Sequence, residues 1–265
     1  MKKAEMPVLF LGHGSPMNAV ENNAFSSGWR ALGKRLSRPS AILCVSAHWQ
    51  TAGTAVHISR TPRTIHDFYG FPKELYSVTY PCPGAPEMAE RVRGLVRRAQ
   101  VRRDMEWGLD HGAWSVIRRL FPGADVPVFQ LSMDEEQPAA FHYELGRELA
   151  PLRDEGVLMV ASGNIVHNLG LMAQAANAAP YDWALEFDAS VKKLLECGDD
   201  SPLIAYESMG GAAELSVPTP EHYWPLLYAM GMRRGGDSVS FPVEGMAHAS
   251  LSMRCVMFSR GSAVS

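Results

Sequence analysis

The stretch VLFLGHGSPM (8–17) joins a short apolar run to an abrupt turn. Its four leading apolar residues predict a strand that is covered on both faces. His13 follows between Gly12 and Gly14, which allow a sharp turn and the close approach of a bulky ligand. The stretch therefore predicts a buried strand that presents an imidazole at its carboxyl end.

Comparable apolar runs recur along the chain and alternate with helical patterns. The predicted strands are VLFL (8–11), AILCVSA (41–47), VPVFQLS (126–132) and VLMVAS (157–162), and the predicted helices span 23–36, 85–99 and 138–150. This alternation predicts an α/β fold with a largely parallel central sheet, which SLSMRCVMF (250–258) closes. No repeat or linker interrupts the pattern, so we expect residues 1–265 to form a single catalytic domain.

The composition narrows the class of function. A net charge of −3 and a pI near 6.3 give no reason to expect nucleic-acid binding. No apolar run reaches the ~18 residues that a membrane helix needs. The four cysteines are scattered without a CxxC pair, and no signal peptide precedes the first strand. We therefore expect a cytoplasmic protein in a reducing compartment.

Three histidines fall at or just after predicted strands: His13, His48 in VSAHW, and His167 in ASGNIVHN. The carboxyl ends of parallel strands meet at one edge of a sheet, so we expect these imidazoles to lie on one rim. Histidine is the commonest protein ligand for metals, and three nitrogens with open positions suit zinc, iron or another first-row metal. The pattern predicts a metal site at this rim.

Two further histidines stand beside predicted helix starts. His222 lies in PTPEHYWP, where Thr219 is the expected N-cap and Pro220 the first helical residue. His111 lies in WGLDHGAW, directly after Asp110 and before another helix. Both are candidates for the same site.

The remaining histidines outside the loops favour structural roles. His57 lies in TAVHIS (54–59), whose alternation predicts a half-exposed strand with His57 on the more polar side. His142 neighbours the apolar stripe of its helix and is expected to face solvent. His248 has no supporting context.

The segment 60–84 is rich in proline, glycine and aromatic residues and is long for a loop without regular structure. Such loops often form lids or pocket walls. Within HDFYGFP (66–72), His66 and Asp67 either enter an active site or belong to a structural turn whose aromatic residues cover a sheet edge. The turn GHGSP matches neither a dinucleotide-binding, a phosphate-binding nor a GxSxG pattern, so Ser15 is not a candidate nucleophile.

Six motifs appear in order: LFLGHGSPMN, CVSAHW, TIHDFYGFP, DHGAW, ASGNIVHN and PTPEHYWPLLY. Together they resemble the class III (LigB-type) extradiol ring-cleavage dioxygenases, and within them the 4,5-DOPA extradiol dioxygenase family with its YgiD-like bacterial members. The resemblance runs from about residue 7 to 257. It implies an α/β sandwich around a central, largely parallel or mixed sheet flanked by helices.

The resemblance also assigns roles to residues. It implies a non-haem Fe(II) centre, which zinc often occupies in isolated proteins, held by His13, His48 and His222. His167 would lie at the metal as general acid/base and is counted as an additional ligand in some members, while His111 would support catalysis by orienting the substrate. Independently of the resemblance, we expect Trp49 and the segment 60–84 to cover the aromatic ring of the substrate, with His66, Asp67 and Tyr69 as contacts.

One position departs from the wider group, whose metal is held by two histidines and a carboxylate. Here Glu221 and His222 stand side by side, and adjacent residues of a helix point about 100° apart. We therefore expect only one of them to bind the metal. The resemblance favours His222, with Glu221 as the alternative.

The implied activity is that of an oxidoreductase: an Fe(II)-dependent extradiol dioxygenase that cleaves a DOPA-like catechol with O₂ and yields a muconic semialdehyde-type product. The expected partners are therefore the catechol and O₂, without nucleic acid or membrane. Two alternatives remain at this stage. One is a zinc-dependent hydrolase that uses the same histidines, and the other is a non-enzymatic LigB-like protein.

Overall fold

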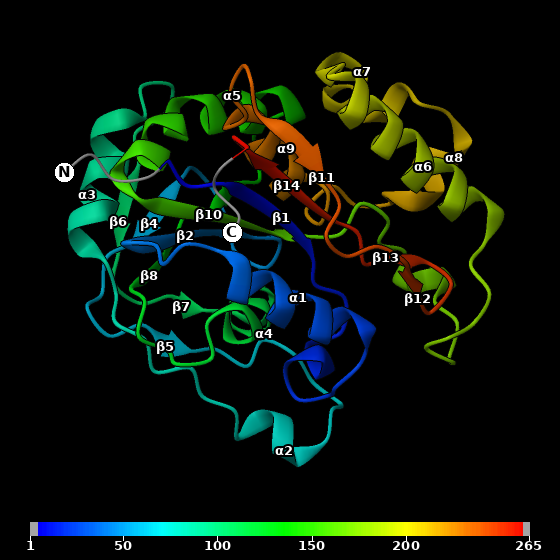
Figure 1. The fold of residues 1–265 in the computed structure, drawn as a ribbon, viewed down its shortest axis with the longest axis horizontal. Helices are drawn as coiled ribbons and strands as arrows, with labels where there is room; N and C mark the ends of the chain where they lie inside the picture. Colours follow the sequence, from blue (N-terminus) through cyan, green and yellow to red (C-terminus); the bar gives the residue numbers. More distant parts are fainter. Residues whose placement is uncertain (1–4, 262–265) are drawn as a thin grey trace.

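The computed structural model describes residues 5–261, and a six-stranded sheet lies at its centre (Figure 1). The strand order is β11-β14-β1-β10-β2-β8. In that order the strands span Ser238–Ser240, Cys255–Ser259, Val8–Gly12, Val157–Gly163, Ala41–Ser46 and Val128–Gln130. All four apolar runs that predicted strands supply strands of this sheet.

The sheet is mixed. Strands β1, β10, β2 and β8 are parallel to one another, whereas β14 is antiparallel to both β1 and β11. The predicted closing strand is confirmed over its second half as β14. Its first part instead contains β13 (Leu251–Ser252), which pairs with β12 (Met246–Ala247) outside the main sheet.

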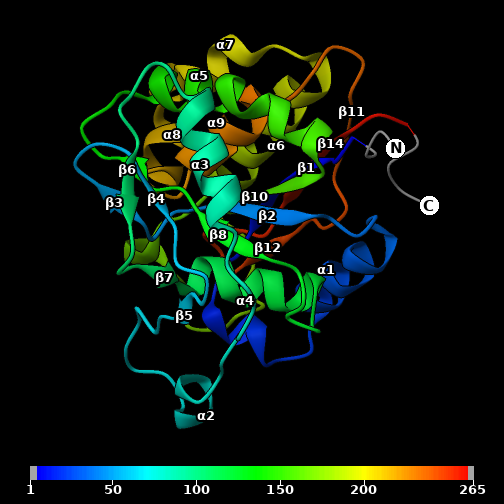
Figure 2. The same ribbon diagram turned by 90° about the vertical axis from the view of Figure 1, so that its left-hand side faces the viewer.

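Helices cover both faces of the sheet (Figures 1 and 2). On one side lie α5 (Ala139–Leu149) and α9 (Trp224–Gly231), and on the other lie α1 (Ala24–Arg35) and α4 (His111–Leu120). Residues along each strand alternate between the two cores: Phe10 packs in the core beneath α5 and α9, whereas Leu9 and Leu11 pack in the core beside α1 and α4. Both faces are therefore buried, which explains why the central strands are apolar without interruption.

The helices confirm the three predicted positions. Ala24–Arg35 forms α1, Pro86–Leu95 forms α3 and Ala139–Leu149 forms α5. The others are α2 (Lys73–Tyr76), α4 (His111–Leu120), α6 (Asp182–Cys197), α7 (Asp200–Ile204), α8 (Gly211–Ser216) and α9 (Trp224–Gly231), with 3₁₀ turns η1 (Pro16–Ala19), η2 (Ala150–Glu155), η3 (Leu169–Leu171) and η4 (Tyr206–Ser208). None of the helices within residues 5–261 is long and apolar enough to cross a membrane.

Short strand pairs anchor the segment between β2 and α4. They are β3 (Gln50–Thr51) with β9 (Met133–Asp134), β4 (Ala55–His57) with β6 (Arg102–Asp104), and β5 (Arg63–Thr64) with β7 (Gly108–Leu109). The segment 60–84 is thus tied down by β5 but carries α2 away from the sheet in both views (Figures 1 and 2).

Two predictions about histidine exposure were wrong. Residues 55–57 of β4 are fully buried, because β4 is covered by β6 and bridges to Leu131, so His57 is enclosed. His142 is also buried, because its face of α5 packs against α9. There its ring stacks on Trp224 at 4.2 Å between centroids, and its Nδ1 lies 3.1 Å from the Tyr228 hydroxyl.

The predicted N-cap at Thr219 was also wrong, because α9 begins later, at Trp224. The backbone amides of Tyr223 and Trp224 both donate to the Pro220 carbonyl, which makes 220–223 a turn. The Thr219 hydroxyl donates instead to Glu221 Oε1 at 2.8 Å. His222 therefore sits in a turn and not on a helix.

Candidate metal centre

Five histidines converge beyond the carboxyl ends of the parallel strands. His13 follows β1 directly, His48 comes two residues after β2, and His167 comes four residues after β10. His111 opens α4 and His222 lies in the turn before α9. The register explains the convergence, because Gly12 pairs with Gly163 and Ser162 with Ser46, so the three strands end level with one another.

Three of these rings surround a common point. The ring centroids of His13, His48 and His222 lie 5.1–5.2 Å apart in every pair. One nitrogen from each ring lies within 4.8 Å of the other two. The structure thus brings together the three histidines to which the resemblance assigned the metal.

Hydrogen bonding fixes the tautomer of His13. Its Nδ1 lies 3.1 Å from Ser162 Oγ, and the Ser162 hydroxyl donates its own proton to the Gly112 carbonyl at 2.6 Å. Because that hydroxyl can then only accept from the imidazole, Nδ1 of His13 carries the proton. Nε2 of His13 therefore presents a lone pair, and it faces His48 Nε2 at 3.2 Å.

Glu221 fixes the tautomer of His222 in the same way that Ser162 fixes that of His13. Nδ1 of His222 lies 3.0 Å from Glu221 Oε1, so Nδ1 donates to the carboxylate. Nε2 of His222 is buried and has no hydrogen-bond partner among the described residues. The two adjacent side chains are thus arranged in series, with the carboxylate behind the imidazole whose free nitrogen faces the cluster.

Asp67 lies behind the other pair of rings, His48 and His111. Its Oδ1 accepts from the His111 backbone amide at 2.8 Å, and its Oδ2 lies 2.9 Å from His111 Nδ1 and 3.6 Å from His48 Nδ1. Burial alone would raise the pKa of Asp67, but these hydrogen bonds from His111 hold that pKa below its ordinary value. The segment 60–84 therefore reaches the cluster through this carboxylate.

Four of the imidazoles, those of His13, His48, His167 and His222, have lowered pKa values and are neutral at pH 7. Burial lowers the pKa of His13 and of His222 well below the ordinary value, and neighbouring histidines lower it further. Burial likewise lowers the pKa of His48 to about 3 and that of His167 to about 4. Neutral imidazoles are the form that binds metal ions.

The residues present therefore fit a metal. Nε2 of His13 and Nε2 of His48 lie 3.2 Å apart, and Nε2 of His222 is buried without a hydrogen-bond partner among the described residues, which costs free energy. A cation held by these rings would supply the missing partner. Carboxylate or hydroxyl groups behind metal-binding imidazoles are the usual outer support of such sites.

His167 borders this group on one side. Its ring lies parallel to that of His222, with 3.4 Å between centroids and 6° between planes. It is held from the backbone, where its amide donates to the Ser216 carbonyl. His167 is half-buried, so it stands between the enclosed rings and solvent.

A buried carboxylate supports the start of α4. Asp110 caps the helix by accepting from the Ala113 amide, and it also accepts from Ser46 Oγ at 2.6 Å and Gln130 Nε2 at 2.8 Å. Burial raises the pKa of Asp110. This network holds the helix end that supplies His111 and the Gly112 carbonyl. Sequence reasoning noticed Asp110 only as a neighbour of His111.

Three candidates for substrate contact make no direct ring contact with the five histidines of the cluster. Trp49 is 2% exposed and stacks on Trp107, with 5.5 Å between ring centroids. Tyr69 is 92% exposed, and His66 Nε2 lies 2.9 Å from the Val78 carbonyl in an aromatic group under α2. No ring contact between described residues joins these three to the cluster. Phe68, which sequence reasoning passed over, does contact it.

Phe68 places its ring edge-on to His111 at 5.6 Å between centroids. The signal for it in the sequence is its position directly after Asp67 in HDFYGFP. Ser162 was also missed, because its partner His13 is 149 residues away in the chain. Such a contact is visible only once the strands are paired.

The two glycines around His13 act differently from the expectation. Gly14 has φ +55°, so the sharp turn is confirmed. However, a Cβ at Gly12 would lie 2.7 Å from the Ser252 carbonyl, and one at Gly14 would lie 2.5 Å from Met253 Sδ. The space beside these glycines is filled by residues 252–253, so they do not leave room for a ligand.

Comparison with known families fits this geometry. A family model described as the catalytic LigB subunit of aromatic ring-opening dioxygenase matches residues 7–254. The chain belongs to the LigB family. The chain is therefore an extradiol ring-cleavage dioxygenase, like the relatives described next. This confirms the prediction drawn from the six motifs.

Individual LigB relatives cover nearly the whole chain. A 4,5-DOPA dioxygenase extradiol of Escherichia coli is 49% identical over 97% of this chain and 96% of its own length. A protein of the same name from Beta vulgaris is 40% identical over 84% of this chain and 85% of its own. The crystal structure of an uncharacterized protein of Escherichia coli K12 superposes with a TM-score of 0.84 at 44% identity, covering 96% of this chain and all of the other.

Proposed function

We propose that this LigB enzyme is an Fe(II)-dependent dioxygenase that opens the ring of a DOPA-like catechol with O₂ and gives a muconic semialdehyde-type product. The observation that carries the proposal is the convergence of one ring nitrogen from each of His13, His48 and His222, all within 4.8 Å of one another. The printed names of the relatives from Escherichia coli and Beta vulgaris support DOPA as the substrate class.

In this proposal His13, His48 and His222 hold the metal, and Ser162, Asp67 and Glu221 orient them from behind. Fe(II), when bound there, supplies open positions at which the two catechol oxygens and O₂ meet. Glu221 is assigned to orientation because its Oε1 is already engaged by Nδ1 of His222 and by the Thr219 hydroxyl.

His167 is proposed as the acid/base group. It is a neutral base at pH 7, since burial lowers its pKa to about 4, and its ring lies against that of a metal-binding histidine. It can therefore take a proton from a catechol hydroxyl and return it later in the reaction. Held face to face with His222, it is not assigned to the metal as a further ligand.

His111 is proposed to orient the substrate. Asp67 Oδ2 accepts a hydrogen bond from His111 Nδ1, so the other ring nitrogen is the one available to a catechol hydroxyl. Asp67 then acts through His111 and does not touch the substrate. Phe68 keeps the His111 ring in place from its other side.

The test is anaerobic reconstitution with Fe(II), followed by a panel of catechols that includes DOPA. We expect oxygen uptake together with a yellow ring-opened product. Absence of uptake with every catechol, at verified iron occupancy, would overturn the proposal.

The same donor set favours one second candidate, a zinc hydrolase, because three histidines with an open position also describe catalytic zinc sites. The zinc-loaded protein, tested on esters and amides without O₂, separates the two activities. We further propose one catalytic domain, which the match over residues 7–254 supports, and a cytoplasmic setting, which the four free cysteines support.

A further inference from the structure

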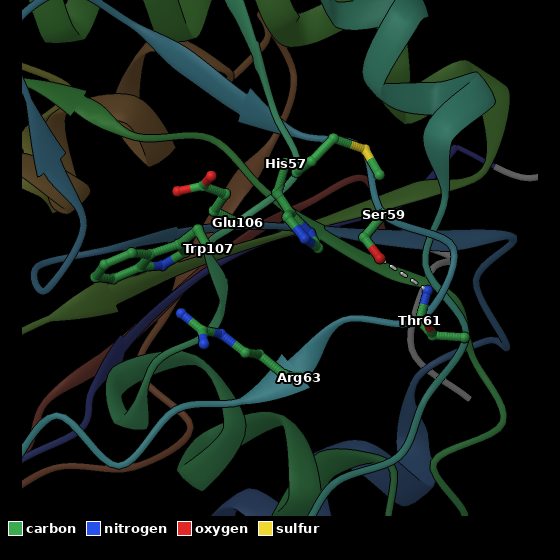
Figure 3. Close-up of a pocket in the computed structure, with 7 residues that line it drawn as sticks. His57, Ser59, Thr61, Arg63, Glu106 and Trp107 are labelled. Atoms are coloured by element: carbon green, nitrogen blue, oxygen red, sulfur yellow. Dashed lines mark hydrogen bonds between the residues drawn. The ribbon is translucent and has the colours of Figure 1, made fainter.

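A cavity of about 390 Å³ lies outside the histidine cluster, where the β4–β5 connection faces the β6–β7 connection (Figure 3). Its lining residues are His57, Ser59, Thr61, Arg63, Met105, Glu106 and Trp107. None of the five cluster histidines lines it. Its volume is in the range of small-molecule sites, and no role in the proposed reaction uses it.

Opposite charges line this cavity without neutralising each other. Arg63 and Glu106 are both exposed, and neither forms an ion pair with any residue between 5 and 261. The stem of Arg63 packs on the backbone of Gly108, where a Cβ would come within 2.7 Å of its Cγ. A guanidinium with a fixed stem is well suited to hold a carboxylate.

Polar groups line the side of the cavity away from Trp107. Ser59 Oγ accepts from the Thr61 amide at 3.2 Å, which leaves the Ser59 hydroxyl proton free to donate. His57 is 1% exposed, and neither of its ring nitrogens has a hydrogen-bond partner among the described residues. Figure 3 shows its ring between Ser59 and Thr61 on one side and Glu106 and Trp107 on the other.

Trp107 forms a flat and rigid wall. Its ring stacks on Trp49 with 5° between planes, and its Nε1 donates to Asp110 Oδ2 at 3.4 Å. Met105, which is 64% exposed, adds an apolar thioether beside it. An aromatic plane and a flexible apolar side chain together suit an aromatic or aliphatic group.

We propose that this cavity is a second ligand site, which binds a free amino acid in its zwitterionic form. Arg63 takes the carboxylate, and Glu106 takes the ammonium group. The side chain of the ligand lies along Trp107 and Met105. This site goes beyond the proposed function, since it needs neither a metal nor the histidine cluster.

The presence of Glu106 distinguishes an amino acid from a simple anion. A carboxylate without an ammonium group gains from Arg63 but is repelled by Glu106, because both charges line the same cavity. An amine without a carboxylate is attracted by Glu106 but repelled by Arg63. Only a ligand with both charges satisfies both side chains.

The test measures binding of L-phenylalanine to the full chain by calorimetry and by tryptophan fluorescence, to which Trp107 contributes. L-phenylalanine lacks the paired oxygens of a catechol, so chelation at the cluster does not contribute. We expect saturable binding that is unchanged after metal removal and in His13→Ala. Affinity for 3-phenylpropionate and for phenethylamine should be at least about tenfold weaker, the loss expected for one charged contact.

Two variants assign the contacts. Arg63→Gln should lower the affinity for L-phenylalanine by at least about tenfold. Glu106→Gln should also lower the affinity for L-phenylalanine, but it should raise the affinity for 3-phenylpropionate. Arg38→Gln, an exposed arginine paired with Asp125 elsewhere, is the matched control and should bind like the wild type. No saturable binding to the wild type, or equal affinity in Arg63→Gln, would overturn the proposal. So would loss of binding in His13→Ala, which would place the ligand in the histidine cluster.

Discussion

Two groups of buried histidines occupy this molecule. At the carboxyl rim of the sheet, His13 and His222 direct Nδ1 toward an oxygen behind them, and one nitrogen of each lies within 4.8 Å of a nitrogen of His48. Between α5 and α9, the Nδ1 atom of His142 lies 3.1 Å from the Tyr228 hydroxyl, and its ring stacks on Trp224. In the first group the free nitrogens converge, whereas in the second the free nitrogen is isolated.

Burial alone does not separate these groups. It lowers the pKa of His142 to about 4 and that of His48 to about 3, so both are neutral at pH 7. The difference lies in the direction of the lone pairs and in the oxygens that set the tautomer. A metal binds where neutral imidazoles point at one another, and a single buried imidazole only fills space.

The largest effect should follow loss of a rim imidazole. His13→Ala or His48→Ala removes one converging nitrogen, so we expect metal affinity to fall by more than the ~10–100-fold typical of outer support, with loss of turnover. Metal content by mass spectrometry and oxygen uptake measure this. His142→Phe is the control and should keep its metal, whereas full metal content in His13→Ala would refute the ligand assignment.

His167 tests whether a ring beside the metal differs from a ring that holds it. His167→Ala should keep most of the metal and lower turnover by about 10²–10⁴-fold, the usual contribution of a positioned acid/base group. Parallel measurement of metal content and turnover separates the two roles. Near-normal turnover would remove His167 from the acid/base role, and loss of the metal would make it a ligand.

The carboxylate behind His222 should have a smaller effect. Glu221→Ala leaves Nδ1 of His222 without its acceptor, so metal affinity should fall by about 10–100-fold, and Glu221→Gln should fall less because its amide oxygen still accepts. Competition with a chelator measures the affinity. Glu214→Ala, an exposed glutamate on α8, is the control. Unchanged affinity in Glu221→Ala would deny the support, and complete loss of the metal would make Glu221 a ligand.

The sequence predicted the part of the site that follows from strand order. Because β1, β2 and β10 are parallel neighbours, residues just after them must meet, and His13, His48 and His167 do. His222 reaches the same rim through packing: the Asn164 amide donates to its carbonyl, and a Cβ at Gly163 would come within 2.1 Å of that oxygen. The local pattern offered His222 only as a candidate, and the resemblance to a family assigned it to the metal.

The partners behind the rings were not predictable from local patterns. From the sequence, Ser162 was only the end of a strand, Asp67 a loop residue, and Glu221 an alternative metal ligand. Nothing in the sequence shows which way a side chain points. His142 failed for a related reason. The helical pattern assigns α5 one buried face, whereas α5 packs mainly against α9 and also contacts α3 and α7, so a residue beside the apolar stripe is enclosed.

The smallest expected effect is the pH dependence that His142 adds to stability. Its pKa is about 4 in the folded protein and 6.5 when unfolded, so the unfolded chain binds the extra proton as pH falls below 6.5. Stability is therefore unaffected above about pH 7 and falls by roughly 1 kcal/mol between pH 7.5 and 5.5. In His142→Phe this contribution disappears, while the rim histidines contribute equally to both proteins. Urea unfolding of the wild type and of His142→Phe over this pH range measures the difference, and parallel curves would mean that His142 has the same pKa in the folded and unfolded states.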